Sequence, residues 1–161
     1  MSDIENFLQA CLHTDQTIRS NAEKAITEMR NNNPETLAQG LVSGMALPDE
    51  ATAGLAAVLY RSNFIEKREF LTKNPAIAQQ GKLTINGLIS PAKRTILLKK
   101  YADVLVGLHE ILRTGSEFLA LISDTSNSAD NNIKELSMYC IELATECPDM
   151  MEMLRAEAGY S

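Results

Sequence analysis

Tryptophan is absent from this sequence of 161 residues, and aromatic residues make up only 5% of it. Aromatic and β-branched side chains are the ones that β-sheets favour. The apolar residues, which supply 45% of the chain, are biased instead towards Ala, Leu and Ile, which suit packed helices. The composition therefore predicts an all-α protein with enough apolar side chains to form a core.

Cysteine and histidine are scarce as well, with three and two residues respectively. Cys11, Cys140 and Cys147 include no Cys-x-x-Cys pair, and a zinc site would need more ligands than the chain offers. Cys140 and Cys147 stand two helical turns apart, where we expect both to be small apolar core residues. This cysteine usage is typical of a reducing compartment, and the sequence predicts neither a metal site nor a cofactor.

Catalytic motifs are missing too. The sequence contains no Gly-rich phosphate loop, no Gly-x-Ser-x-Gly elbow, no His-Glu-x-x-His pair and no His-x-Glu combined with Cys-x-x-Cys. His13 is expected in a turn and His109 among apolar neighbours, in neither case beside a catalytic arrangement. We expect no enzymatic activity, with a small helical-bundle enzyme as the alternative.

Long apolar runs are also lacking, so that no segment would span a membrane and no signal-peptide core is recognisable at the start. The formal net charge is −6, and such an acidic surface argues against a nucleic-acid binder. It would suit basic protein partners, or simply be the ordinary surface of a soluble protein. We expect a soluble intracellular chain that binds neither nucleic acid nor a membrane.

Capping residues, prolines and helical periodicity divide the chain into helices. We expect a short helix capped by Asp3, then helices over about 15–30, 35–46, 50–64, a weaker one after Pro75, and others over 91–112, 117–122, 130–147 and from 150 onward. The helix over 50–64 is rich in small residues, which let neighbouring helices approach closely.

Two of these helices and one connecting segment carry more specific expectations. Ser90 and Pro91 form a cap followed by proline at the first helical position, and Ile96 is expected in the core of the helix that they open. The weaker helix is expected to bury the face that carries Ile77, Gln80, Thr84 and Leu88. The polar run over 124–128 is expected to be a loop.

One helix start recurs along the chain. The pattern spans twelve positions. Position 1 is an acid or Thr, position 4 is apolar or Thr, and position 5 is basic or small. Position 8 is small, and positions 11 and 12 are apolar. It fits at Asp15, Asp49, Thr95 and Asp130, which lie 34, 46 and 35 residues apart. Helix pairs at about this period are typical of α-solenoids, and the alternative is an irregular helical bundle.

The recurring residues resemble a known family. The stretches Asp15–Glu23, Leu37 and Ala56–Arg61 are similar to the amino-terminal HEAT repeats of the importin-β (karyopherin-β) nuclear transport receptors. Lys99–Leu105 resembles the second helix of the third repeat in that family, and the likeness is nearest to the importin-5 type. It covers nearly the whole chain, although HEAT consensus residues chiefly do structural work.

The resemblance implies a right-handed α-α superhelix of the HEAT/armadillo kind, with about four helix pairs and the start of a fifth. The repeats would cover residues 3–31, 34–68, 75–113 and 116–147, with 148–161 beginning the next. In this family the second helices line a concave face that binds the small GTPase Ran in its GTP form. Basic cargo proteins and nucleoporins would need further repeats, and the expected location is cytoplasm and nucleus. The alternative is a HEAT-repeat scaffold unrelated to nuclear transport.

Charged and aromatic residues on the predicted second helices are the candidates for partner binding. They are Arg19, Tyr60, Arg61, Asn63, Lys99, Lys100, Glu135 and Glu142. Each also has a structural interpretation: Arg19, like Lys134 at the same repeat position, could align neighbouring repeats through a salt bridge or hydrogen bond, and Tyr60 could lie at the edge of the core. The lysines and glutamates could be no more than solvated helix faces.

Overall fold

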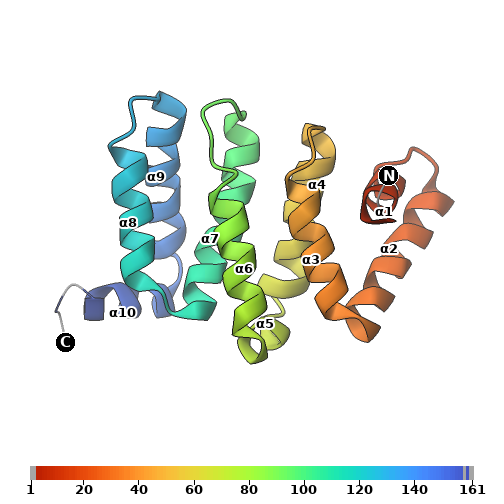
Figure 1. Ribbon diagram of the computed structural model, residues 1–161, viewed down its shortest axis with the longest axis horizontal. Coiled ribbons are helices and arrows are strands. Elements are labelled where there is room, and N and C mark those ends of the chain that lie inside the picture. Colours follow the sequence, from red (N-terminus) through yellow and green to blue (C-terminus); the bar gives the residue numbers. More distant parts are fainter. Residues whose placement is uncertain (1–2, 158, 160–161) are drawn as a thin grey trace. The chain divides into compact units, whose positions relative to one another are not determined.

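Helices dominate the computed structural model, which describes residues 3–157 and 159 and contains no β-strand within them (Figure 1). The prediction of an all-α protein is confirmed. The chain divides into two compact units, Met1–Ile77 and Ala78–Ser161, which are described separately below.

The first unit contains the more amino-terminal helices. They are α1 (Asp3–Cys11), α2 (Gln16–Asn32), α3 (Pro34–Met45), α4 (Glu50–Tyr60), a π-helical turn η1 (Arg61–Ile65) and α5 (Glu69–Lys73). α3 packs against α4, and α1 contacts α2, α3 and α4. The core residues of this unit are apolar throughout: Leu8, Ile26, Leu37, Leu41, Met45, Ala53, Ala56, Phe64 and Leu71. The capping expected from the Asp3 side chain lies outside the described residues.

Aspartate caps fix where α2 and α4 begin. The Asp15 carboxylate accepts the backbone N–H groups of Thr17 at 2.8 Å and Ile18 at 3.2 Å. The Asp49 carboxylate accepts that of Thr52 at 3.0 Å. Such caps satisfy helix-start amides that have no partner within the helix, which is why the sequence located both starts correctly.

Small residues allow close helix packing in this unit, as the sequence predicted. A methyl group added at Gly44 would lie 2.9 Å from Leu8 Cδ1 and 3.1 Å from Ala56 Cβ. Real Cβ atoms do not approach so closely, so the packing of α1, α3 and α4 depends on the missing side chain at Gly44 and on the short one at Ala56.

The second unit holds the remaining helices. They are α7 (Thr95–Leu112), α8 (Gly115–Ser126), α9 (Asn131–Thr145), α10 (Pro148–Glu157) and most of α6 (Pro75–Asn86), which crosses the boundary between the units. α9 packs on α7 and on α8, beside which it runs in Figure 1, and α10 packs on both α8 and α9. Their shared core is apolar and includes Leu98, Tyr101, Val104, Leu105, Leu108, Phe118, Leu136, Cys140 and Met150.

The recurring helix start has a consistent structural counterpart. Its small residue is buried in all four copies, at Ala22, Ala56, Ala102 and Ser137. Asp130 caps α9 through the N–H of Ile133 at 3.1 Å, as Asp15 and Asp49 cap their helices. In the third copy Thr95 is instead the first helical residue, with Arg94 in the capping position.

Two predicted apolar positions prove to be exposed. Ile18, the apolar residue three after Asp15 in the recurring pattern, is 40% exposed, whereas Ala22 and Ile26 on the same helix are buried. Ile96, expected in the core of α7, is 56% exposed, whereas the next two residues, Leu97 and Leu98, are buried.

The expected helix start at Ser90 and Pro91 is wrong. The Ser90 carbonyl accepts the N–H of Lys93 at 3.1 Å and its hydroxyl accepts that of Ala92 at 3.2 Å, which closes a turn. Arg94 then adopts an extended conformation with ψ of 149°, and α7 begins at Thr95. The Ser-Pro pair favours a turn as readily as a helix start, and here the turn is formed.

The buried face of α6 also differs from the expectation. Gln80 and Thr84 are exposed, and the buried residues of this helix are Ala78, Gly81, Lys82 and Ile85. These four positions have the spacing of one helix face. The lysine at its centre hides the pattern from a search for apolar residues.

α8 is longer than predicted, since it continues through Ser126 into the region expected to be a loop. The Thr125 hydroxyl donates to the Leu121 carbonyl at 2.8 Å, and the Ser126 hydroxyl donates to the Ser123 carbonyl at 3.0 Å. Polar side chains that bond back onto the preceding turn are compatible with a helix, so a polar run alone did not identify a loop.

Candidate functional site

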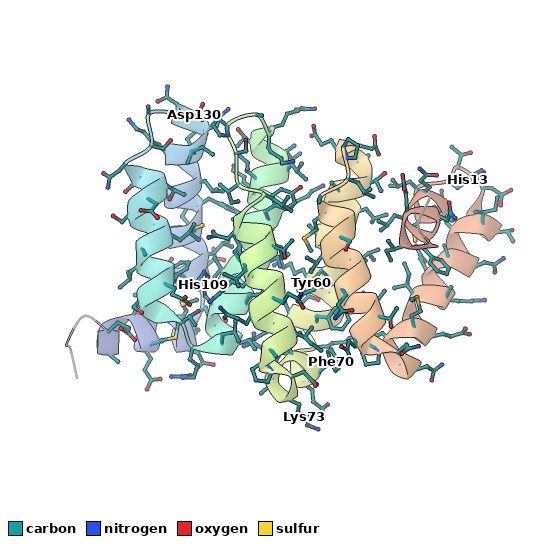
Figure 2. The ribbon with its side chains drawn as sticks, viewed as in Figure 1. His13, Tyr60, Phe70, Lys73, His109 and Asp130 are labelled. Atoms are coloured by element: carbon teal, nitrogen blue, oxygen red, sulfur yellow. The ribbon has the colours of Figure 1, made fainter. Side chains whose placement is uncertain are left out.

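Arg19 binds the turn that precedes its own helix. Its guanidinium donates to the carbonyl of His13 at 3.3 Å and to that of Thr14 at 3.5 Å, and it also contacts the side chain of Gln16. His13, labelled in Figure 2, lies in this turn, and its Nδ1 accepts the N–H of Asp15 at 2.9 Å. The half-buried Arg19 thus stabilises the connection between α1 and α2.

Tyr60 and Asn63 lie where α4 changes into the π-helical turn. Tyr60 is fully buried, its ring centroid lies 5.3 Å from that of Phe64, and burial raises the pKa of its hydroxyl (Figure 2). Asn63 donates to the Leu59 carbonyl at 2.8 Å and accepts from Arg30 at 3.0 Å, which links this turn to α2. Both side chains therefore lie inside the first unit.

Arg61 is the exposed member of the same group. It begins the π-helical turn, in which its carbonyl accepts the N–H of Glu66 at 2.9 Å, five residues later. Single π-turns inserted in α-helices occur frequently at functional sites, and here the turn places an arginine on the surface beside two buried polar residues.

Lys99 belongs to a chain of contacts between α7 and α9. Its ammonium lies 5.4 Å from the centroid of the Tyr139 ring. The Tyr139 hydroxyl donates to the Asp103 carboxylate at 2.7 Å, which fixes the ring in place. A cation over an aromatic face is attracted by the ring quadrupole, so Tyr139 holds the exposed Lys99 ammonium in a defined position.

Glu135 and Glu142 lie one helical turn before and after Tyr139, and both are exposed. Positions three and four residues apart share one face of a helix. Both glutamates therefore lie on the side of α9 that carries Tyr139. Lys100, the neighbouring candidate on α7, is half-buried.

A groove lies where α7 and α9 begin. Its volume is about 580 Å³, and it is lined by Arg94, Thr95, Ile96, Lys99 and Asn132. Two of these side chains are cationic, two carry neutral polar groups and one is aliphatic. Of the candidates found from the sequence, only Lys99 contributes to this groove.

Lys82 is a buried cation that sequence reasoning did not single out. Its side chain is only 4% exposed, and its ammonium lies 2.5 Å from a carboxylate oxygen of Glu117, whose side chain is 54% exposed. The hydrogen bond from Lys82 lowers the pKa of Glu117. Buried charges are tolerated when they are paired, so this contact joins α6 to α8 and is structural.

His109 lies beside this ion pair in the interior of the second unit (Figure 2). Its Nδ1 is 2.8 Å from the Thr114 hydroxyl, and its ring meets that of Phe118 edge-on at 5.5 Å. Burial, and then the charge of Lys82, lower the pKa of His109 to about 4. The imidazole is therefore neutral near pH 7 and packs as part of the core.

The cysteine side chains occupy three different environments. Cys140 is buried, as predicted, and burial raises the pKa of its thiol to about 12. The prediction for Cys147 is wrong: it lies beyond the end of α9 and is half-buried, and its thiol donates to a carboxylate oxygen of Glu110 at 3.0 Å. Burial also raises the pKa values of Cys11 and Cys147. All three are thus protonated near neutral pH, which makes them weak nucleophiles.

Within residues 3–157 and 159, no group of three or more His, Cys, Asp or Glu side chains is placed to hold a metal ion. None of the described helices is both long and apolar enough to cross a bilayer.

Comparisons with protein-family models, with curated proteins and with solved structures found no match. The roles of the candidate residues are therefore assigned from their geometry in the structure.

Proposed function

We propose that this chain is a protein-binding module of stacked helix pairs, the amino-terminal segment of an importin-β-like receptor, and that it binds Ran in the GTP form. The observation that carries the proposal is the recurrent helix start, whose small residue is buried in every copy. In solenoids such a position lets adjacent helices nest, and the surface that the series creates serves for binding.

The proposal assigns partner contacts to the candidates that reach the surface. These are Arg61 in the first unit and Lys99, Glu135 and Glu142 in the second, all of which are exposed. Arginine is enriched among residues that anchor interfaces, and charged residues at a rim set association rates and partner choice. Tyr60 and Asn63, which are buried, would instead support the turn that carries Arg61, and Arg19 would hold the connection between α1 and α2.

A pull-down with Ran tests the proposal. The immobilised chain is incubated with Ran loaded either with a non-hydrolysable GTP analogue or with GDP, and retained Ran is quantified. We expect retention of the GTP form in clear excess. Equal retention of the two forms, or retention of neither, would overturn the proposed function.

A pair of charge-reversal variants locates the contact. Glu142→Lys should reduce retention of GTP-loaded Ran, because it inverts charge on the face of α9 that we assign to the partner. Glu152→Lys, at an exposed position of α10, carries the same charge change away from that face and serves as the control. Equal effects of the two variants would contradict the assignment to α9.

A further inference from the structure

α6 ends on an asparagine with a free side chain. Asn86 is the last residue of this helix, both Asn86 and Gly87 are exposed, and the chain turns there towards α7 (Figure 1). No hydrogen bond joins the Asn86 side chain to another residue that the structure describes. The side-chain amide of Asn74, by contrast, donates to the Phe70 carbonyl at 2.8 Å. The amide group of Asn86 is therefore open to water and to its own backbone.

Gly87 makes this asparagine unlike the others, since no other asparagine in the sequence precedes a glycine. A side chain on the following residue would shield the backbone nitrogen and restrict the backbone, whereas glycine does neither. Packing does not require glycine here, because a methyl group added to Gly87 would meet its nearest atom, the Thr84 carbonyl oxygen, at 3.4 Å. Gly87 therefore matters for the chemistry of Asn86 more than for the fold.

An asparagine before glycine can lose its side-chain nitrogen without an enzyme. A base removes the proton from the Gly87 backbone nitrogen, which attacks Cγ of Asn86 and closes a succinimide ring. The bond between Cγ and Nδ2 breaks, and the nitrogen leaves as ammonia after it has taken up a proton. Water then opens the ring, at Cγ to give aspartate or at the backbone carbonyl to give isoaspartate. Water is the only co-reactant, and nothing is oxidised or reduced.

The last turn of α6 restrains this reaction. The Gly87 N–H donates to the Leu83 carbonyl at 3.2 Å, and the Leu88 N–H donates to the Ile85 carbonyl at 2.9 Å. While the first of these bonds is formed, the Gly87 nitrogen keeps its proton and cannot attack. Helix ends open more readily than helix centres. The reaction therefore starts from the fraction of molecules in which this turn is open.

We propose that Asn86 is a site of spontaneous deamidation, and that opening of the last turn of α6 controls its rate. The product places a carboxylate at the carboxyl end of the helix, where the aligned peptide dipoles already carry partial negative charge. This repulsion opens the turn further, and isoaspartate also adds a methylene group to the backbone. The site goes beyond the proposed function, since it requires neither Ran nor a nucleotide.

Incubation of the folded chain at mildly alkaline pH tests the proposal. Samples taken over time are digested at acidic pH, mass spectrometry follows each asparagine, and an isoaspartyl methyltransferase identifies isoaspartate. We expect product at Asn86 well before product at Asn127, the exposed asparagine that follows the end of α8. Equal rates at the two positions would overturn the proposal. So would an unchanged Asn86 over a period in which the urea-unfolded chain converts.

A substitution at Gly87 tests the role of the glycine. Gly87→Ala leaves Asn86 in place and should slow its conversion by at least about tenfold, because the methyl group hinders attack by the backbone nitrogen. Conversion at Asn127 in the same molecule should not change, which provides an internal control. An unchanged rate at Asn86 in this variant would contradict the proposed route through the succinimide.

Two glycine substitutions in α6 test the control by its last turn. Leu83→Gly, at a position that is 61% exposed, should loosen this turn and speed conversion of Asn86 by about fivefold. Ala76→Gly, at an exposed position in the first turn of the same helix, should leave the rate within about twofold. In urea the two variants should convert at the same rate. Equal rates in the folded state as well would contradict the control by the helix end.

The effect of the product is tested with a stable mimic. Asn86→Asp introduces the carboxylate, and Asn86→Gln keeps a neutral amide as the matched control. Hydrogen exchange at the Gly87 and Leu88 amides, corrected for intrinsic rates, should be about twofold to fivefold faster in the aspartate variant. Equal exchange in the two variants would contradict the proposed opening of the turn by the new charge.

Discussion

The ion pair between Lys82 and Glu117 allows a quantitative prediction about the second unit. Lys82 lies on the buried face of α6 with only 4% of its side chain exposed, and Glu117 of α8 is its partner at 2.5 Å. The variant Glu117→Gln keeps the shape of the side chain and removes its charge. A buried ammonium would then remain without the carboxylate that compensates for its lost hydration.

Two limits bracket the size of the effect. Removing one partner from a fully buried ion pair costs about 3 to 5 kcal/mol. Here 54% of the Glu117 side chain is exposed, so water can solvate part of the remaining charge. A hydrogen bond to a charged group contributes about 1.5 to 3 kcal/mol. We therefore expect Glu117→Gln to lower the free energy of unfolding by about 2 kcal/mol.

A second substitution distinguishes the loss of pairing from a general defect. Lys82→Met replaces the buried charge by an apolar chain of similar length and should change the free energy of unfolding by less than about 1 kcal/mol. In the Lys82→Met background, Glu117→Gln should have almost no further effect, because no buried cation remains to be compensated.

Urea unfolding followed by circular dichroism measures these differences in the free energy of unfolding. Because the chain comprises two units, hydrogen exchange at the amides of α6 and α8 is used as well, since it reports the stability of the second unit by itself. Glu152→Gln, at an exposed position, controls for the loss of one carboxylate. The reasoning is refuted if Glu117→Gln changes stability no more than this control does, or if the two substitutions are simply additive.

Three further predictions concern the interior. Burial lowers the pKa of His109 from 6.5 to about 4, so the unfolded chain takes up the proton at a higher pH than the folded chain does. The free energy of unfolding should therefore decline by up to roughly 3 kcal/mol as the pH drops from about 6.5 to 4. In urea unfolding over this pH range His109→Gln should flatten the decline, and an unchanged slope would contradict the assignment. Gly44→Ala should lower the melting temperature of the first unit by several degrees, since the new methyl group would meet Leu8 at 2.9 Å, whereas Gly87→Ala, with its nearest atom at 3.4 Å, should have little effect. Within the described residues the Tyr60 hydroxyl has no hydrogen-bond partner, so Tyr60→Phe should stabilise the fold by about 1 kcal/mol in urea unfolding, and a clear loss of stability would show that the hydroxyl is satisfied.

Local signals in the sequence predicted much of the fold. The carboxylates of Asp15, Asp49 and Asp130 cap helices through amides two or three residues away, so their action is visible in a short stretch of sequence. The failures have two kinds of cause. Ser90 and Pro91 suit a turn as well as a helix start, and Lys82 is buried only because Glu117, 35 residues later, compensates for its charge.

The candidate site was predicted less completely, because the partners of its residues are also distant in the sequence. Lys99 was recognised from its charge, but the ring that positions it belongs to Tyr139, and the carboxylate that holds the ring is Asp103, 36 residues away. Tyr60 and Asn63 looked like surface residues because aromatic and amide side chains suit both interfaces and interiors. Their burial follows from packing between helices, which helical periodicity alone does not specify.

The affinity of the chain for Ran in its two nucleotide states tests the proposed function most directly. Calorimetric titration with Ran carrying a non-hydrolysable GTP analogue, and separately with Ran carrying GDP, gives two dissociation constants under matched conditions. The proposal predicts that the GTP form binds at least about tenfold more tightly, a difference of about 1.4 kcal/mol. Equal affinities for the two forms, or no heat of binding with either, would contradict it.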